Sequence, residues 1–276
     1  MAIRIVADST SDINIEEAKK LGIDIAPLMV IFGDEEYRDG VDITVDEFYK
    51  KIRTSKDFPS TSQVNQLEFE DILNKYIDDE VIVITIATEL SGTYGSLQLA
   101  IEETGHKNVY SIDSNSVTTP IRYLVHLAIE YKNQGLSAKE IVEKINTLKN
   151  KVTLYAAIED LTYLKKGGRL SSTKAILGQL LNVKPIIRVE DSKVCLAETR
   201  RGTKKAYEAL VDKFLEERDE KYPYYLSHAD AIDRIEILKE KLKEKGVEPE
   251  KEISFIGPTV GVHVGPGAIA ITYVKK

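Results

Sequence analysis

Short apolar runs alternate with amphipathic stretches along the first half of the chain. Four runs rich in Ile and Val predict strands at residues 3–7, 23–31, 81–86 and 109–112. Three of the four are nearly all apolar, which is typical of parallel-sheet strands that are covered on both faces. Because strands that alternate with helices form wound layers, this half of the chain predicts an α/β domain with a parallel sheet.

The amphipathic stretches carry their own helix signals. Thr44 and Glu47 form a capping box, in which a hydroxyl is followed three residues later by a carboxylate, and they predict a helix of about ten residues. Further helices are expected at residues 65–76 and 93–103. A longer helix should follow Ser116, because five side chains recur there on one helical stripe: Tyr123, Leu124, Leu127, Ala128 and Tyr131.

The second half of the chain mixes hairpins with helices. A second capping box, Ser137 with Glu140, opens a helix that ends near Lys149, and the polar residues 146–151 indicate a domain boundary between 1–150 and 151–276. Strands are predicted at 153–158, 186–189, 194–197, 224–227, 252–256 and 268–274, and helices at 171–181, 202–218 and 231–245. The polar residues 190–193 predict a hairpin turn. The second domain should therefore be α/β with a mixed or antiparallel sheet.

Composition narrows the classes of function. The 38 Lys and Arg residues are outnumbered by 45 Asp and Glu residues, and the net charge of −7 argues against broad contact with nucleic acid or an anionic membrane face. The single cysteine, Cys195, excludes an intrachain disulfide and multi-cysteine metal sites. Asp8 interrupts any apolar signal core, and no apolar run has the length of a membrane span. We therefore expect a cytoplasmic protein.

Two hydroxyl-rich segments lie beside predicted elements. Residues 8–12 (DSTSD) follow the first strand at its carboxyl end, where open α/β sheets bind ligands. Ser11 or Asp12 could instead cap a helix, and capping is the favoured interpretation for this segment alone. Residues 59–63 (PSTSQ) place Thr61 and Ser62 before a helix, where hydroxyls and backbone N–H groups either hold a carboxylate or phosphate or cap the helix.

Ser91 occupies the turn between a predicted strand and the next helix. Its hydroxyl, with the backbone N–H groups of Gly92 and Thr93, could bind an anion at the positive end of the helix dipole. Ser91 could instead be a nucleophile. Glu89, however, stands where the Gly-x-Ser-x-Gly elbow requires glycine, and only four histidines are available as a base. Anion binding is therefore the preferred interpretation.

Two basic segments are also candidates for anion contacts. Residues 165–169 (KKGGR) either end a helix with a glycine cap or present Arg169 to an anionic partner. Arg200 and Arg201 stand at the predicted start of a helix, where the dipole disfavours cations. Because departures from local rules concentrate at functional sites, the arginine pair suggests a function.

A glycine-rich segment surrounds His263. Residues 257–268 contain four of the 16 glycines, which permit unusual backbone angles and close approach of another group. A nominal dinucleotide fingerprint, Gly265-x-Gly267-x-x-Ala270, has only six residues after it and no room for the βαβ unit that it needs. No histidine pair has helical zinc-ligand spacing. The segment therefore indicates neither a nucleotide cofactor nor a metal.

Taken together, the motifs resemble those of the DegV family. They occur in the family's order over the whole chain: DSTSD (8–12), TSQ (61–63), LSGTY (90–94), KKGGRL (165–170) and VGVHVGPGA (260–268). The resemblance implies a two-domain DegV-like α/β fold, with the hydroxyl motifs in 1–150 and the arginine and histidine motifs in 151–276. It also implies a bacterial fatty acid-binding protein that serves a fatty acid kinase in phospholipid metabolism.

The resemblance also assigns residues to the ligand. Seven residues are implied around the carboxylate of a buried long-chain fatty acid such as palmitate or oleate: Thr61, Ser62, Ser91, Gly92, Thr93, Arg201 and His263. No metal, cofactor or catalytic residue is implied, because a separate kinase makes the acyl phosphate. Burial of a sixteen-carbon tail is worth about 11 kcal/mol before ordering and association costs.

Two other classes of function stay open at this point. Ser91 and His263 could act together in an esterase or acyl transferase, or the chain could be a regulatory module that senses lipid. An esterase predicts ester hydrolysis that is lost when Ser91 is replaced by alanine, whereas a carrier has no hydrolysis to lose.

Overall fold

The computed structural model describes residues 1–170, 183–249 and 252–276, which form two units. The first comprises Met1–Asn150 with Gly257–Val260, and the second comprises Lys151–Ile256 with Gly261–Lys276. A short segment near the end of the chain therefore returns to the first unit, which the sequence pattern does not predict. The helix predicted at residues 171–181 lies outside the described residues.

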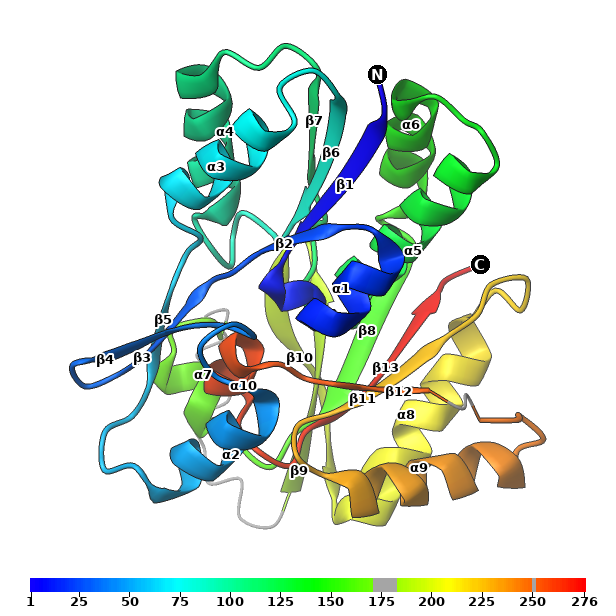
Figure 1. Cartoon of the computed structure of the whole chain (residues 1–276). Helices are drawn as coiled ribbons and strands as arrows, with labels where there is room; N and C mark the ends of the chain where they lie inside the picture. The colour runs from blue at the N-terminus through cyan, green and yellow to red at the C-terminus, as the bar shows by residue number, and fades with distance from the viewer. Residues whose placement is uncertain (171–182, 250–251) are drawn as a thin grey trace. The chain divides into compact units, whose positions relative to one another are not determined.

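A four-stranded parallel sheet forms the centre of the first unit, in the order β2-β1-β6-β7. Its strands are β1 (Ile3–Asp8), β2 (Asp24–Ala26), β6 (Glu80–Thr85) and β7 (Val109–Asp113). Its main helices are α3 (Gln66–Lys75), α4 (Thr93–Thr104), α5 (Thr119–Asn133) and α6 (Ala138–Leu148). Figure 1 shows α3 and α4 on one face of the sheet and α5 and α6 on the other. Coverage of both faces explains the apolar strands, and the predicted wound parallel layer is confirmed.

Local sequence signals set several helix starts in this unit. α2 (Val45–Thr54) follows Thr44, whose hydroxyl accepts from the backbone N–H of Glu47 while the Glu47 carboxylate accepts from the backbone N–H of Thr44. Ser137 and Glu140 form the same reciprocal pair at α6. Both predicted capping boxes are thus confirmed.

The DSTSD segment does not cap a helix in the predicted way. α1 (Ile15–Leu21) is capped by Asn14, whose side chain accepts from the backbone N–H of Glu17. Residues Ser9–Ser11 form a short 3-10 turn, η1, which ends at Asp12 in the left-handed conformation with φ 58°. The expectation that Ser11 or Asp12 supplies the helix cap is therefore wrong, and the segment has another role.

The apolar run at residues 23–31 forms two strands instead of one. β2 ends at Ala26, and β3 (Met29–Phe32) begins a separate antiparallel sheet with β4 (Glu35–Arg38) and β5 (Ser60–Ser62), in the order β4-β3-β5. Pro27 lies between the two strands and has no backbone N–H to continue the ladder. The proline lets the chain leave the parallel sheet, and the new sheet carries the hydroxyl segment on its edge strand β5.

A six-stranded mixed sheet forms the centre of the second unit, in the order β10-β9-β8-β13-β11-β12. Its strands are β8 (Val152–Ala157), β9 (Val183–Glu190), β10 (Lys193–Arg201), β11 (Tyr225–His228), β12 (Ile253–Phe255) and β13 (Ile269–Val274). Only the β11–β12 pair is parallel among the described neighbours. β9 and β10 form the predicted hairpin, whose turn residues Asp191 and Ser192 have φ 48° and 62°. The predicted mixed sheet is confirmed.

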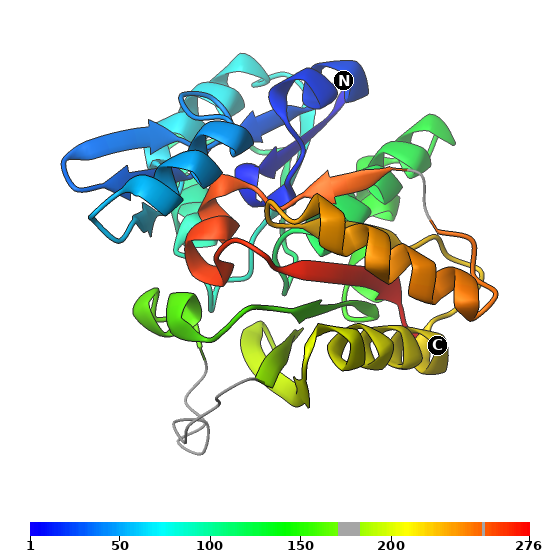
Figure 2. The same ribbon diagram turned by 90° about the horizontal axis from the view of Figure 1, so that it is seen from below.

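Two long helices, α8 (Thr203–Glu217) and α9 (Ile232–Glu244), pack side by side on one face of this sheet (Figure 2). Phe214 of α8 lies at the centre of their core, with ring centroids 4.8 Å from Tyr224 and 5.3 Å from Tyr273. Two shorter helices are α7 (Thr162–Lys166) and α10 (Pro258–Val264). Within the ranges that the structure describes, no helix has both the length and the apolar character needed to cross a membrane.

Candidate functional site

Two hydroxyl-rich segments lie side by side in the first unit. Gln63 follows β5 and donates through Nε2 to Ser96 Oγ on α4, at 2.6 Å. The backbone N–H of Val64 donates to Thr93 Oγ1 at 3.3 Å. These contacts join residues that are about thirty positions apart in sequence and place the TSQ segment against the start of α4.

The turn before α4 presents hydroxyls at the start of a helix. Ser91 Oγ lies 2.9 Å from Thr93 Oγ1 and accepts from the backbone N–H of Thr93 at 3.3 Å. Ser91 is half-buried, Gly92 is exposed and Thr93 is buried. A β-carbon at Gly92 would lie 1.9 Å from Gln63 Oε1, so glycine leaves the space that the Gln63 side chain fills. Hydroxyl and N–H donors at the positive end of a helix suit an anion.

Thr61 and Ser62 belong to the edge strand β5, where they pair with Val30 and Met29 of β3. The helix that follows, α3, is capped by Asn65, whose side chain accepts from the backbone N–H of Leu67. The capping alternative for Thr61 and Ser62 is therefore excluded, and the anion-binding interpretation of their hydroxyls remains.

The KKGGR and histidine segments meet in the second unit. A β-carbon at Gly167 would lie 2.1 Å from His263 Nδ1, so this glycine lets the imidazole ring approach the end of α7. Gly265, with φ 72°, gives similar room to Tyr163, whose ring would lie 2.4 Å from a β-carbon there. The expectation that the glycines of residues 257–268 permit close approach is confirmed at Gly265.

The imidazole of His263 stays neutral near pH 7. Burial, with a smaller contribution from the positive charge of Arg169, lowers the pKa of His263 to about 4. A neutral imidazole carries one N–H donor and one acceptor nitrogen. His263 can therefore donate a hydrogen bond to a carboxylate without bringing a charge of its own.

Arg201 is the last residue of β10, where it pairs with Val183 and is exposed. α8 begins only after Gly202, which has φ 80° and no side chain to cap the helix. The arginine pair therefore ends β10, directly before the helix predicted at residues 202–218, which is α8 in the structure. Arg200 and Arg201 point to opposite faces of β10, and Arg200 is ion-paired with Glu198.

The sequence-predicted residues therefore fall into two sets. The first unit holds Thr61, Ser62, Ser91, Gly92 and Thr93, and the second holds Arg201 and His263. The sequence did not predict that Gln63 and Ser96 bond to each other beside the Ser91-Gly92-Thr93 turn. The amide of the TSQ motif was a visible signal, but the pairing of Gln63 with a helix residue 33 positions away follows only from the fold.

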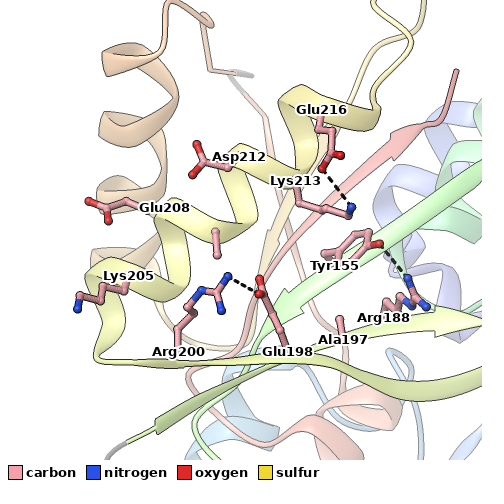
Figure 3. Close-up of a pocket in the computed structure, with 11 residues that line it drawn as sticks. Tyr155, Arg188, Ala197, Glu198, Arg200, Lys205, Glu208, Asp212, Lys213 and Glu216 are labelled. Atoms are coloured by element: carbon pink, nitrogen blue, oxygen red, sulfur yellow. Dashed lines mark hydrogen bonds and ion pairs between the residues drawn. The ribbon is translucent and has the colours of Figure 1, made fainter.

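A polar cavity of about 630 Å³ lies between α8 and the β9–β10 hairpin of the second unit (Figure 3). Its charged walls are neutralised by ion pairs, such as Arg188 with Glu190 at 2.6 Å and Lys213 with Glu216 at 3.2 Å. Mixed and paired charges do not favour an anionic head group here. In the described part of the chain, no group of three acidic, histidine or cysteine side chains is arranged to hold a metal ion.

Known proteins resemble this chain over its whole length. A sequence model of the DegV family, described as a family of uncharacterised protein, matches residues 2–276. A DegV domain-containing protein of Clostridium acetobutylicum is 33% identical, over 99% of this chain and 99% of its own.

Solved structures show the same fold. A DegV family protein of Thermus thermophilus, described for its fatty acid binding, has a TM-score of 0.90 and 28% identity over 100% of both chains. A stearic acid-binding protein of Eubacterium ventriosum has a TM-score of 0.85 and 28% identity, over 100% of this chain and 99% of that one. The predicted DegV-like α/β fold is confirmed.

Proposed function

The chain belongs to the DegV family, and from this premise we propose that it binds a long-chain fatty acid in a buried tunnel and holds its carboxylate by hydrogen bonds. The related structures that bind fatty acids support the ligand class. The observation that carries the proposal is the hydroxyl turn Ser91-Gly92-Thr93 against the TSQ segment, at the start of α4.

The head group needs several donors at once. A carboxylate taken out of water is prohibitively costly unless hydrogen bonds replace its hydration. The hydroxyl of Ser91, that of Thr61 or Ser62, whose side chains alternate across β5, and the backbone N–H groups near Gly92 and Thr93 are donors of the right kind. Hydroxyls accept as well as donate, so they tolerate a carboxylate or the larger acyl phosphate.

We assign Arg201 and His263 of the second unit to the same head group. Arg201 would supply the positive charge and a forked set of donors, and the neutral imidazole of His263 would supply one more N–H. The acyl tail supplies most of the affinity, because each buried methylene is worth about 0.8 kcal/mol. Palmitate and oleate are the expected ligands.

The carrier itself does no chemistry in this proposal. A separate cytoplasmic fatty acid kinase would phosphorylate the presented carboxylate and release an acyl phosphate for phospholipid synthesis. The resemblance of all five motifs to the DegV family supports this role. Hydrogen-bond donors suffice for presentation, so no catalytic base, cofactor or metal is assigned to the chain.

Replacing Ser91 with alanine should weaken palmitate binding by roughly tenfold, because one hydrogen bond to a charged group is worth about 1.5 kcal/mol or more. Calorimetric titration of delipidated protein measures this change. Ser55→Ala is the control, since the Ser55 hydroxyl donates locally to the Asp57 carbonyl at 3.1 Å. Equal affinities in the two variants would contradict the assignment of Ser91. Hydrolysis of a palmitoyl ester that Ser91→Ala abolishes would favour the esterase alternative.

A further inference from the structure

Three carboxyl groups gather in the first unit outside the proposed head-group residues. Asp8 and Asp39 are buried, with exposed fractions of 0% and 4%, and Asp12 is half-buried. Asp8 ends β1, Asp12 follows η1, and Asp39 follows β4. Buried carboxyl groups are costly unless they are hydrogen-bonded, so their partners indicate their role.

Two of these groups hold the segment that returns late in the chain. Asp12 Oδ1 accepts from the backbone N–H of Gly257 at 2.8 Å, and Asp39 Oδ2 accepts from the backbone N–H of Thr259 at 3.2 Å. Asp39 Oδ2 also accepts from Ser9 Oγ at 3.1 Å. A β-carbon at Gly257 would lie 2.9 Å from Asp12 Oδ1, so the carboxyl group packs directly on the glycine backbone.

Donors from other elements fix the two carboxyl groups in turn. Thr118, at the start of α5, donates to Asp12 Oδ2, and Arg122 Nη1 donates to the Asp12 carbonyl at 3.1 Å. Ser9 Oγ, which donates to Asp39, accepts from the backbone N–H of Leu28 at 3.0 Å, and this bond holds the Ser9 hydroxyl in place. The clasp is therefore built from η1 and the residue after it, the residue after β4, the start of α5 and the chain before β3.

We propose that Asp12 and Asp39 are positioning residues, a carboxylate clasp that fixes Gly257–Val260 in the first unit. This segment contains the first turn of α10, and His263 lies in the last turn of the same helix. The importance of the clasp for ligand binding rests on the proposed function, whereas the clasp itself is defined by its hydrogen bonds. The DSTSD motif thus acts through Ser9 and Asp12 on a segment about 245 residues later in the chain.

The charges that face the clasp come from three elements. Asp8 accepts from the backbone N–H of Ile86 at 2.6 Å on the neighbouring strand end. Arg122 of α5 is ion-paired with Glu17 of α1, and His126 lies 3.8 Å from the same carboxylate. Burial raises the pKa values of Asp8 and Asp12, the Asp39 charge raises both further, and the Arg122 charge offsets part of the increase for Asp12.

Because Asp39 titrates, its contribution to the stability of the fold depends on pH in a direction that can be measured. Burial raises the pKa of Asp39 to about 6, and burial is also the main cause of the raised pKa of Asp12. A carboxyl group whose pKa is higher in the folded than in the unfolded protein contributes stability that is present at low pH. That contribution is lost as the pH rises through the folded-state pKa. The stability that Asp39 contributes is therefore lost between about pH 4, near its unfolded-state pKa, and slightly above pH 6.

Asp39→Asn removes the titration and keeps an acceptor oxygen for Thr259. Relative to wild type, the folding equilibrium constant of Asp39→Asn should rise by about tenfold between pH 5 and pH 7.5. His228 and His263, whose pKa values burial lowers, act in both proteins and cancel in this comparison. Denaturant unfolding at each pH measures the ratio, and exposed Asp34→Asn is the control. A ratio that does not change with pH would overturn the titrating role of Asp39.

Asp39→Ala should release the segment, whereas Asp39→Asn should retain it. Hydrogen exchange of a peptide that covers 257–260 should be faster in Asp39→Ala and close to wild type in Asp39→Asn. Palmitate affinity should fall in Asp39→Ala and recover in Asp39→Asn.

Equal exchange in all three proteins would refute the clasp. If wild type binds no palmitate, the proposed function fails, and exchange still decides the clasp. Should Asp39→Ala not fold, Gly257→Ala, whose methyl group meets Asp12, provides the disrupted variant.

Discussion

Replacing Arg201 with methionine should weaken palmitate binding by roughly a hundredfold. Methionine keeps much of the side-chain volume but removes the charge and all donors. A hydrogen bond to a charged group is worth about 1.5–3 kcal/mol, and the upper end applies where an arginine meets a carboxylate. Calorimetric titration of the delipidated variant with palmitate measures the loss.

Arg200→Met is the matched control for this prediction. Arg200 is the neighbouring residue on β10, is also exposed, and points to the other face of the strand, where it pairs with Glu198 in the cavity of Figure 3. The Arg200→Met variant should bind palmitate with the affinity of the wild-type protein. Equal losses in the two variants would show that general positive charge, and not Arg201 itself, matters to the ligand.

Replacing Phe214 with alanine should lower the free energy of unfolding of the second unit by about 3–5 kcal/mol. Phe214 is fully buried on α8 and packs against the rings of Tyr224 and Tyr273, so its removal leaves a cavity that neighbouring strands and helices cannot fill. Denaturant unfolding followed by circular dichroism measures the change. Phe255→Ala, at a phenylalanine of the same unit that is 46% exposed, should cost much less. Similar losses in both variants would contradict the central place of Phe214 in this core.

Local sequence signals predicted helices and sheets well where a few neighbouring residues decide the structure. The boxes at Thr44 and Ser137 predicted helix starts because capping involves residues only three positions apart. The run at residues 23–31 was mistaken for one strand. Its apolar pattern is continuous, but Pro27 has no backbone N–H to donate and therefore interrupts the strand. α10 was missed because Gly261 has low helix propensity, and the amides of Gly257 and Thr259 at the helix start gain their acceptors, Asp12 and Asp39, only in the folded chain.

The same distinction holds for the candidate site. Motifs such as Ser91-Gly92-Thr93 and Thr61-Ser62-Gln63 could be identified as anion-binding candidates because their chemistry is local. The contact of Gln63 with Gly92 and Ser96 could not be predicted, since it depends on how β5 and α4 lie in the fold. The role of DSTSD was also misjudged, because its Asp12 carboxylate accepts from the amide of Gly257 instead of from the adjacent helix.

The bound lipid tests the central claim most directly. Protein purified under mild conditions should be extracted with organic solvent, and the released material identified by mass spectrometry. We expect a long-chain fatty acid in a near-stoichiometric amount. A protein that releases no fatty acid and also fails to bind added palmitate or oleate would contradict the proposed function.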